Sequence, residues 1–232
     1  MRERLIVALD LPSVDEARHL VSRLGSTVQA YKLGMWLLFD PGFNALVDAL
    51  VQAGKHVFLD YKMYDIPETV RRGVASVAAR GARIVTVHGD PEIIAAAVEG
   101  AARSDLMVFA VTVLTSQDDA ALAAMGYRLT VPELVGLRAG IAARAGARGI
   151  IASAADNPAA LREAAGVPLL VATPGIRLPG GATHDQKRIA TPDTAIHRGA
   201  DYLVVGRPIT QALDPVAAAH QVLSLMEDGA RR

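Results

Sequence analysis

Eight short apolar runs recur along this chain, and they limit its possible folds more than any other feature. Each run is largely continuous in Val, Ile and Leu rather than alternating with polar residues, which is typical of strands buried on both faces of a parallel sheet. Stretches between the runs, such as 13–25 and 41–54, have the apolar spacing of amphipathic helices, and Gly54 is the predicted C-cap of the second. The predicted strands are 5–10, 28–34, 56–62, 82–89, 106–115, 147–153, 168–175 and 202–207.

Eight strand–helix units within 232 residues predict one α/β domain, a (β/α)8 TIM barrel that spans residues 1–232. An open doubly wound sheet is the structural alternative, but eight units of similar size favour closure into a barrel. No Gly/Ser linker or change of composition divides the chain. Two segments interrupt the alternation. Residues 116–127 predict an extra short helix, and residues 177–188 predict a polar, Gly-rich loop of the kind that is often functional.

The composition excludes several classes of protein. The 24 basic and 24 acidic residues cancel, so electrostatics give no support for binding to nucleic acid. The absence of cysteine excludes disulfides and cysteine-based metal sites, and it suits a reducing compartment. The apolar run at residues 5–9 is too short for a signal peptide, and no run in the chain is long enough for a membrane span. We therefore expect a cytoplasmic protein that binds neither nucleic acid nor membrane.

Polar residues mark the carboxyl end of almost every predicted strand. In a barrel these ends meet at one rim, where the active sites of such folds are built. Any one of these residues could simply mark where surface polarity resumes, and His88 is expected to be a hydrogen-bonded structural residue. Four charges inside or beside apolar strands are harder to explain in that way. The rim residues are Asp10, Lys32, Asp60, Lys62, His88, Thr115, Ser116, Ser153, Arg177 and Arg207.

The segment FLDYKMYDIPETV, residues 58–70, places charges at the end of a strand that is otherwise apolar. Alternation of side chains along a strand predicts that Asp60 and Lys62 face the same way. Burial of an unpaired charge is costly, so charges at the buried end of a strand indicate a functional role. Asp65 precedes Pro67 in the pattern of a helix start, and local sequence alone favours an N-cap role for this aspartate.

Two arginines flank the position where barrels of this kind commonly bind phosphate. That position lies at the loops after the seventh and eighth strands. Arg177 follows the seventh strand and Gln186 lies in the loop beyond it, while Gly206 and Arg207 follow the eighth strand. A glycine permits close approach of the backbone to an anion. Each arginine alone could be a solvated surface charge, but the two together predict a phosphate site.

These motifs together resemble the orotidine 5′-monophosphate decarboxylase family. The segment DYKMYDIPETV carries Asp-x-Lys-x-x-Asp-Ile-Pro, which is similar to the signature of that family. The motifs VALD, YKLG, VTVLTS, TPGIR, DQKR and VVGRPI stand in the family's order and spacing, so the resemblance covers essentially the whole chain. The Asp-x-Lys-x-x-Asp pattern alone is less specific, because related phosphosugar enzymes share it.

The resemblance implies a set of catalytic roles. Lys62 would donate a proton to carbon 6 of the pyrimidine, and Asp60 would lie beside the departing carboxylate. Lys32 would hold the charge network and contact the ribose. Asp65 and Thr69 would cross the interface of a homodimer into the site of the neighbouring subunit, in place of the capping role or in addition to it. The resemblance implies no metal and no other cofactor.

The resemblance also implies how the substrate is bound. Asp10 would bind the ribose hydroxyls, and Ser116 would bind the amide edge of the pyrimidine with Thr115 beside it. The loop 177–188 would be mobile and would order over the bound nucleotide. The residues that would hold the 5′-phosphate are Arg177, Gln186, Gly206 and Arg207.

The implied reaction explains the alternation of charge. Decarboxylation of orotidine 5′-monophosphate to uridine 5′-monophosphate, the last step of de novo UMP synthesis, leaves an electron pair that the ring cannot readily delocalise. A fixed ammonium group beside that carbon stabilises the charge and can then deliver the proton. Asp60 and the Asp65 of the partner subunit would keep Lys62 protonated, and Lys32 would keep the carboxylates from repelling each other.

Two alternatives remain. A metal-dependent phosphosugar decarboxylase or lyase on the same barrel would hold Mg²⁺ with carboxylates, but Lys32 stands where such a site needs Glu or Asp and would repel the ion. A non-catalytic binder of nucleotide phosphates could keep the fold, because function depends on the site rather than on the fold. Such a binder, however, has no use for a buried proton donor.

Overall fold

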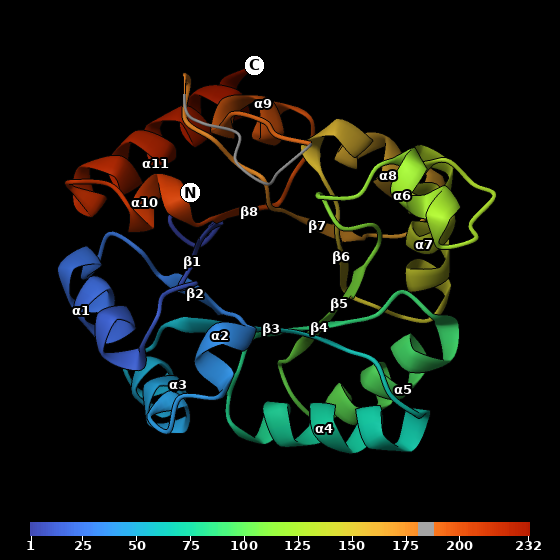
Figure 1. Cartoon of the computed structure of the whole chain (residues 1–232), viewed down its shortest axis with the longest axis horizontal. Coiled ribbons are helices and arrows are strands. Elements are labelled where there is room, and N and C mark those ends of the chain that lie inside the picture. Colours follow the sequence, from blue (N-terminus) through green and yellow to red (C-terminus); the bar gives the residue numbers. More distant parts are fainter. Residues whose placement is uncertain (181–187) are drawn as a thin grey trace.

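Eight parallel strands close into a barrel in the computed structural model, which describes residues 1–180 and 188–232. Figure 1 views the molecule with the strands around the centre and the helices in an outer ring. Neighbouring strands follow the order of the chain, and β8 pairs with β1 to complete the barrel. The strands are β1 (Leu5–Ala8), β2 (Ala30–Leu33), β3 (His56–Met63), β4 (Ile84–Val87), β5 (Met107–Val111), β6 (Gly149–Ile151), β7 (Leu170–Thr173) and β8 (Tyr202–Val205).

Helices cover the outside of the barrel and link successive strands. At the start of α1, the Ser13 side chain accepts the backbone N–H of Glu16. The C-cap of α3 is Ala53, and the predicted Gly54 is the next residue, with φ 70°. In the described parts of the chain, no helix is both long and apolar enough to cross a membrane. The helices are α1 (Val14–Leu24), α2 (Met35–Leu38), α3 (Phe43–Gln52), α4 (Pro67–Ala79), α5 (Pro91–Ala101), α6 (Asp119–Ala124), α7 (Val131–Arg144), the 3₁₀ turn η1 (Ala154–Asp156), α8 (Pro158–Ala165), α9 (Pro192–His197), α10 (Arg207–Thr210) and α11 (Pro215–Arg231).

The closed barrel confirms the predicted fold, and every predicted strand overlaps an observed one. Most observed strands are shorter than the apolar runs, because the runs continue into buried turns. Leu9 and Val113, for example, are buried just beyond the ends of β1 and β5. Helix α6 confirms the extra helix predicted within 116–127. Of the predicted loop 177–188, residues 181–187 lie outside the described residues.

The continuous hydrophobicity of the strands follows from burial on two sides. Leu5 and Val7 of β1 belong to the larger core between strands and helices, whereas Ile6 and Ala8 belong to a separate cluster inside the barrel. Alternate residues of one strand therefore serve two cores, and both cores require apolar side chains. The buried members of the inner cluster are Ile6, Ala8, Ala30, Phe58, Ile84, Phe109, Ala172 and Val204.

A polar layer stands directly on this inner cluster at the carboxyl ends of β2, β3 and β4. The residue two positions beyond Ala30 is Lys32, and the residue two positions beyond Phe58 is Asp60. Because side chains alternate along a strand, both charges continue the inner row of their strands. The apolar cluster thus forms the floor beneath the charged residues and keeps that side of them away from water.

The barrel interior is tight at Gly149, the first residue of β6. A Cβ atom at this position would stand 2.6 Å from Phe109 Cζ and 2.7 Å from the carbonyl oxygen of Leu170. Because neither a buried ring nor a strand backbone moves aside easily, we expect Gly149→Ala to lower the free energy of unfolding by about 1–3 kcal/mol. Urea unfolding of the variant and the wild type measures this change.

Gly136 within α7 provides the matched control, because an added Cβ there has no described atom within 4 Å. Gly136→Ala should raise the free energy of unfolding by about 0.5–1 kcal/mol, since alanine loses less backbone entropy in a helix. Equal effects of the two substitutions would contradict the tight packing assigned to β6.

Candidate active site

Four charged side chains meet at the carboxyl ends of the first three strands. Lys32 Nζ lies 3.0 Å from Asp10 Oδ1 and 3.4 Å from Asp60 Oδ2. Asp60 Oδ1 in turn accepts a hydrogen bond from Lys62 Nζ at 2.8 Å. The side chains of Lys32 and Asp60 are 10% and 14% exposed, whereas those of Lys62 and Asp10 are 37% and 47% exposed. The result is a chain of alternating charge, Asp10–Lys32–Asp60–Lys62, with a buried middle and accessible ends.

The backbone of β3 leaves regular strand geometry where these charges stand. Between Leu59 and Met63, which pair with β4, three residues of β3 lie opposite a single residue of β4. Lys62, one of the three, has φ 47°, in the left-handed region that residues other than glycine rarely adopt. Such a conformation persists only where the surrounding structure holds it, and it is often found at functional sites. A bulge, rather than the plain alternation predicted from sequence, accompanies the contact between Lys62 and Asp60.

Thr86 of β4 fixes this bulge, a role that its local sequence does not signal. The Thr86 Oγ1 accepts a hydrogen bond from the Lys62 backbone N–H at 2.9 Å and donates one to Asp60 Oδ1 at 2.9 Å. The residue is fully buried, so both bonds form away from water. A threonine inside a strand is ordinary, and only the pairing of β3 with β4 identifies this one.

Gly34 leaves the space in which Asp10 and Lys32 meet. A Cβ atom on Gly34 would stand 2.7 Å from Asp10 Oδ1 and 3.3 Å from Lys32 Nζ. Any side chain at this position would therefore displace one of the two charged groups. The motif YKLG contains this glycine, but its spacing alone gives no reason for a glycine there.

The charges in the buried middle of the cluster are fixed by their neighbours. Burial alone would lower the pKa of Lys32, but the carboxylates of Asp60 and Asp10 outweigh this effect and raise the pKa above its usual 10.5. Burial alone would raise the pKa of Asp60, yet the ammonium groups of Lys32 and Lys62, with hydrogen bonds from Lys62 and Thr86, hold the pKa below its usual 3.8. Lys32 and Asp60 are therefore both ionised at neutral pH.

Asp65 and Thr69 are exposed and do not join the charge cluster of their own chain. Asp65 Oδ1 accepts a hydrogen bond from the adjacent backbone N–H of Ile66 at 2.7 Å. Among the described residues, the carboxylate that pairs with Lys62 is that of Asp60 alone. The N-cap of α4 is Ile66, without a side-chain cap, so the N-cap role predicted for Asp65 is wrong. Pro67 sets the helix start instead, because its fixed φ suits the first turn.

The loop after β5 places Thr115 and Ser116 on the same rim. Thr115 is buried and Ser116 is exposed. Arg138 from α7 supports this loop by donating to the carbonyl oxygen of Thr112 and to the hydroxyl of Tyr127. Ser116 thus lies on a loop that is anchored to a helix of the outer ring.

Arg177 and Arg207 follow β7 and β8, as the sequence predicted. Arg177 is buried, and Arg207 is half-buried at the first position of α10, directly after Gly206. Among the described residues, a Cβ on Gly206 would meet the Ala8 Cβ at an ordinary 3.6 Å, so packing within the chain does not require glycine there. The predicted phosphate ligand Gln186 lies outside the described residues.

His88 contacts Tyr64 rather than the charge cluster. The two ring centroids are 4.7 Å apart. The His88 Nδ1 is buried and has no hydrogen-bond partner among the described residues, so the expectation of a hydrogen-bonded histidine is wrong for this atom. Burial, with the nearby charge of Arg138, lowers the pKa of His88 below 6.5.

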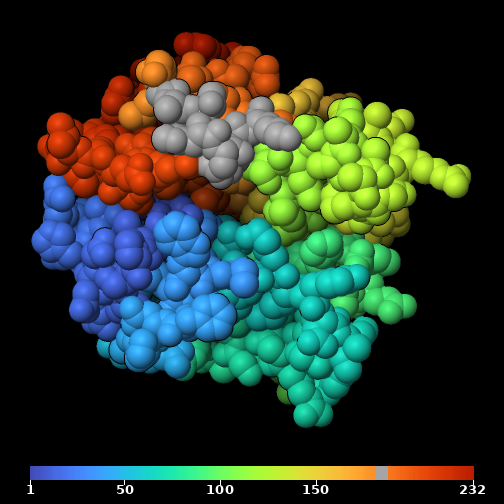
Figure 2. Space-filling model, viewed as in Figure 1, coloured from blue at the N-terminus to red at the C-terminus, as the bar shows by residue number. Residues whose placement is uncertain are grey.

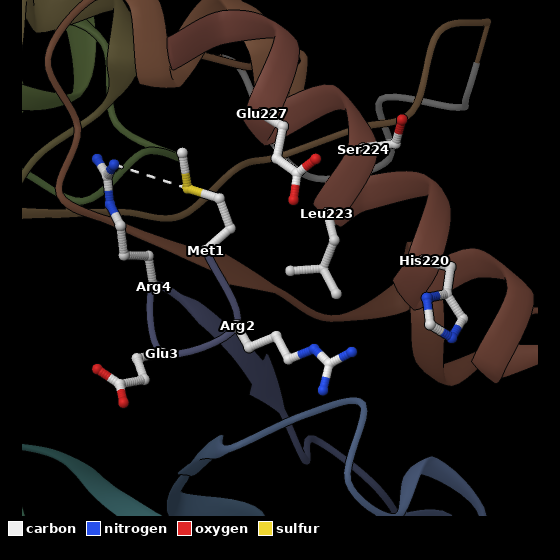
Figure 3. Close-up of a pocket in the computed structure, with 8 residues that line it drawn as sticks. All are labelled: Met1, Arg2, Glu3, Arg4, His220, Leu223, Ser224 and Glu227. Atoms are coloured by element: carbon white, nitrogen blue, oxygen red, sulfur yellow. Dashed lines mark hydrogen bonds between the residues drawn. The ribbon is translucent and has the colours of Figure 1, made fainter.

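A cavity of about 670 Å³ lies at the other end of the barrel, between the residues before β1 and one face of α11 (Figure 3). Its charges are mixed. Arg4 already donates to the carbonyl oxygens of Ala200 and Asp201, and the carboxylates of Glu3 and Glu227 also line the cavity. Because barrel active sites lie at the carboxyl ends of the strands, the size of this cavity does not make it a candidate.

Comparison with known proteins finds relatives over nearly the whole chain. A family model described as "Orotidine 5'-phosphate decarboxylase / HUMPS family" matches residues 3–222. The chain is 51% identical over 222 residues to orotidine 5'-phosphate decarboxylase of Rhodopseudomonas palustris (strain BisA53), which covers 96% of this chain and 94% of that protein. It is 49% identical over 226 residues to the protein of the same name from Methylobacterium nodulans, with 96% and 95% covered. A crystal structure of orotidine 5'-phosphate decarboxylase from Lactobacillus acidophilus superposes with a TM-score of 0.82 at 36% identity, covering 96% of this chain and 98% of that one.

The shifted pKa values predict how stability depends on pH. The lowered pKa of Asp60 stabilises the fold above the usual 3.8, and this contribution is lost as the pH falls through the lowered value. The raised pKa of Lys32 stabilises the fold below the usual 10.5, and this contribution is lost as the pH rises through the raised value. We call the fall in the free energy of unfolding at low pH the acid limb of the stability curve. We expect Asp60→Asn to flatten this acid limb, so that the free energy of unfolding falls less between about pH 5 and pH 3 than in the wild type.

Denaturant unfolding across this pH range measures the effect. Asp105→Asn is the control, because the Asp105 side chain is 97% exposed and the acid limb should survive its loss. An acid limb of wild-type steepness in Asp60→Asn would refute the stabilising role assigned to the buried carboxylate.

Proposed function

Because the chain belongs to the orotidine 5′-phosphate decarboxylase / HUMPS family, we propose that it decarboxylates orotidine 5′-monophosphate to uridine 5′-monophosphate and CO₂. This reaction would be the last step of de novo UMP synthesis. The observation that carries the proposal is the chain of alternating charge at the barrel rim, with the Lys62 ammonium at its accessible end.

The proposed reaction breaks the bond between carbon 6 and the carboxylate, and the electron pair stays on carbon 6. The Lys62 ammonium would stabilise this charge and then transfer a proton from Nζ to the carbon. Asp60, 2.8 Å from Lys62 Nζ, holds that ammonium in place. Lys32 Nζ lies 3.4 Å from Asp60 on the other side and offsets its negative charge. Asp60 would therefore not stand unscreened between Asp10 and the substrate carboxylate when the substrate enters.

The remaining residues are proposed to bind the substrate. The partly exposed carboxylate of Asp10 would accept hydrogen bonds from the ribose, and Ser116, with Thr115 beside it, would contact the pyrimidine amide. We also propose that the loop 177–188 closes over the phosphate, so that remote binding energy orients the reacting ring. The proposed phosphate ligands are Arg177, Gln186, Gly206 and Arg207.

A metal-dependent phosphosugar enzyme is the nearest alternative. The description of the matching family also names a second group, HUMPS, so family membership alone does not decide between the two. The position of Lys32 argues against the metal-dependent enzyme. The Lys32 ammonium lies 3.0 Å from Asp10 and 3.4 Å from Asp60, so the two carboxylates that could hold a divalent cation already share a positive charge. A non-catalytic nucleotide binder is disfavoured by the bulge, which holds a lysine in a rare backbone conformation without any evident gain for binding.

We further propose a homodimer in which Asp65 and Thr69 enter the site of the partner subunit. Large apolar side chains are exposed on α2 and just after it, and also between β3 and α4: Trp36 is 69% exposed, Phe39 80% and Ile66 67%. Because β2 and β3 are adjacent, the segments that follow them lie together on one face, where Figure 2 draws them in blue and teal. An exposed apolar surface of this kind is typical of a protein interface.

Asp65 immediately precedes Ile66 and so lies at this surface, which supports its proposed contribution across the interface. For the location of the enzyme we propose the cytoplasm, since a chain without cysteine suits a reducing compartment.

The reaction is tested by adding orotidine 5′-monophosphate to the purified protein in excess chelator and following the ultraviolet absorbance. The wild type should convert it to uridine 5′-monophosphate, and Lys62→Ala should lower kcat by at least about 10⁴-fold, because it removes both the proton donor and the positive charge. Lys55→Ala, just before the opposite end of the same strand, is the control and should keep wild-type activity.

Two negative results of this assay would favour different alternatives. Loss of wild-type activity on addition of the chelator would favour the metal-dependent alternative. Tight binding of the nucleotide without conversion would favour the non-catalytic binder.

The shared site is tested by mixing two inactive variants, Lys62→Ala and Asp65→Ala. If Asp65 acts across the interface, each hybrid dimer contains one intact site, and an equal mixture should recover about a quarter of wild-type activity. A mixture of Lys62→Ala with Lys32→Ala is the control, because both residues belong to the site of their own chain and no hybrid site is intact. Absence of recovery in the first mixture, despite demonstrated subunit exchange, would refute the shared site.

A further inference from the structure

Arg188 connects three loops of the barrel rim. Its Nη1 pairs with Asp156 Oδ1 at 2.5 Å, and its Nη2 donates to the carbonyl oxygens of Val113 at 3.0 Å and Leu114 at 3.2 Å. The Arg188 carbonyl oxygen accepts a hydrogen bond from Ser153 Oγ at 3.3 Å. A single residue therefore joins the chain after β7 to the loop after β5 and to η1 after β6.

This network is internal to the protein rather than part of its solvated surface. The side chains of Arg188 and Asp156 are 14% and 5% exposed. Asp156 Oδ2 also accepts the backbone N–H of Ser153 at 2.8 Å, which holds the carboxylate within η1. A buried ion pair often adds little to stability compared with apolar side chains of the same size, so stability alone does not explain its presence. The planar guanidinium reaches the carboxylate through one nitrogen and the two carbonyl groups through another, whereas a lysine would have to bring all three acceptors to a single nitrogen.

One end of the network reaches Arg177, one of the proposed phosphate residues. Ala190, two residues after Arg188, accepts the backbone N–H of Arg177 at 2.9 Å and donates its own N–H to the carbonyl oxygen of Gly175 at 3.2 Å. These two bonds fix the chain after β7 against the stretch that carries Arg188. The backbone position of Arg177 is thereby linked to that of Arg188.

The other end reaches the proposed pyrimidine residues. Val113 and Leu114, whose carbonyl groups Arg188 holds, directly precede Thr115 and Ser116. Leu114 is itself exposed, so little apolar packing fixes it in place. The hydrogen bonds from Arg188 therefore add to the burial of Val113 and Thr115 in restraining the backbone that presents Ser116.

We propose that the Arg188–Asp156 pair is a positioning device that holds the proposed phosphate residue Arg177 and the proposed pyrimidine-binding loop at a fixed separation. Arg188 does not touch the substrate in this proposal and acts through the carbonyl groups of Val113 and Leu114. Phosphate binding at one end then places the pyrimidine correctly at the other. The inference rests on the proposed function, because it assigns the two ends to the phosphate and the base of one nucleotide.

The test compares substrates with and without the 5′-phosphate. Arg188→Lys keeps the charge but loses the planar fork, and Asp156→Asn keeps the size but loses the charge. Each should lower kcat/KM for orotidine 5′-monophosphate by about tenfold, a usual size for coupling between two sites. For the nucleoside orotidine, which lacks the phosphate, the loss should be about threefold at most. Equal losses for both substrates would overturn the proposal.

Arg162→Lys is the matched control. Arg162 pairs with Asp201 at 2.6 Å and donates to the carbonyl oxygens of Leu169 and Gly199, so it resembles Arg188 in its contacts but lies at the amino ends of β7 and β8. Its replacement should not change the ratio of activities on the two substrates. A change in that ratio as large as the one in Arg188→Lys would show a general loss of rigidity and would overturn the proposal.

Two further measurements distinguish loss of the positioning role from loss of folding and from loss of turnover. The double variant Arg188→Met with Asp156→Leu replaces the pair by apolar side chains and should fold even where a single variant does not. Calorimetry of uridine 5′-monophosphate and uridine measures the advantage given by the phosphate without any reaction. If the wild type binds these ligands but does not turn over substrate, the proposed function is refuted, yet the calorimetry still tests the coupling. If the phosphate increases affinity by the same factor in the wild type and the variants, the positioning role of Arg188 is refuted.

Discussion

Lys32 stands between two carboxylates, and the rest of the charge cluster depends on it. Without this ammonium, Asp10 and Asp60 would face each other above an apolar floor, where water could screen them only from one side. Asp60 would then gain a proton more easily and would hold Lys62 less firmly. Asp60 therefore connects the buried Lys32 to the accessible Lys62, which is the proposed proton donor.

The local backbone is arranged around this charge balance at a cost to regular structure. Lys62 has a positive φ, and β3 carries a bulge. Gly34 has no side chain, which leaves the space in which Asp10 and Lys32 meet. Thr86 satisfies both the amide freed by the bulge and an oxygen of Asp60. Departures from local rules that are compensated in this way are expected at functional sites, and the apolar layers of the barrel supply the stability that they lack.

The fold was predictable because strands buried on two sides leave continuous apolar runs, and the charges were predictable because they interrupt such runs. Other features depend on long-range neighbours that a local pattern does not contain. Thr86 and Gly34 are ordinary residues whose roles arise from strand register and from a neighbouring side chain. The N-cap interpretation of Asp65 failed because Pro67 alone accounts for the helix start. Arg188 stood within a recognised motif, but its partners come from two other loops.

The site divides into two halves with different physical demands. In the proposed reaction, the charged residues of the first three strands must stay within tenths of an ångström of their working positions, and they lie in or next to strands on a packed floor. The proposed binding residues lie on loops after β5, β7 and β8, which suits a site that a nucleotide must enter and leave. In the proposed dimer, the exposed apolar surface after β2 and β3 would be covered by the partner. Dimerisation would then stiffen the half that carries the chemistry, while the half that binds substrate would rely on hydrogen bonds such as those of Arg188.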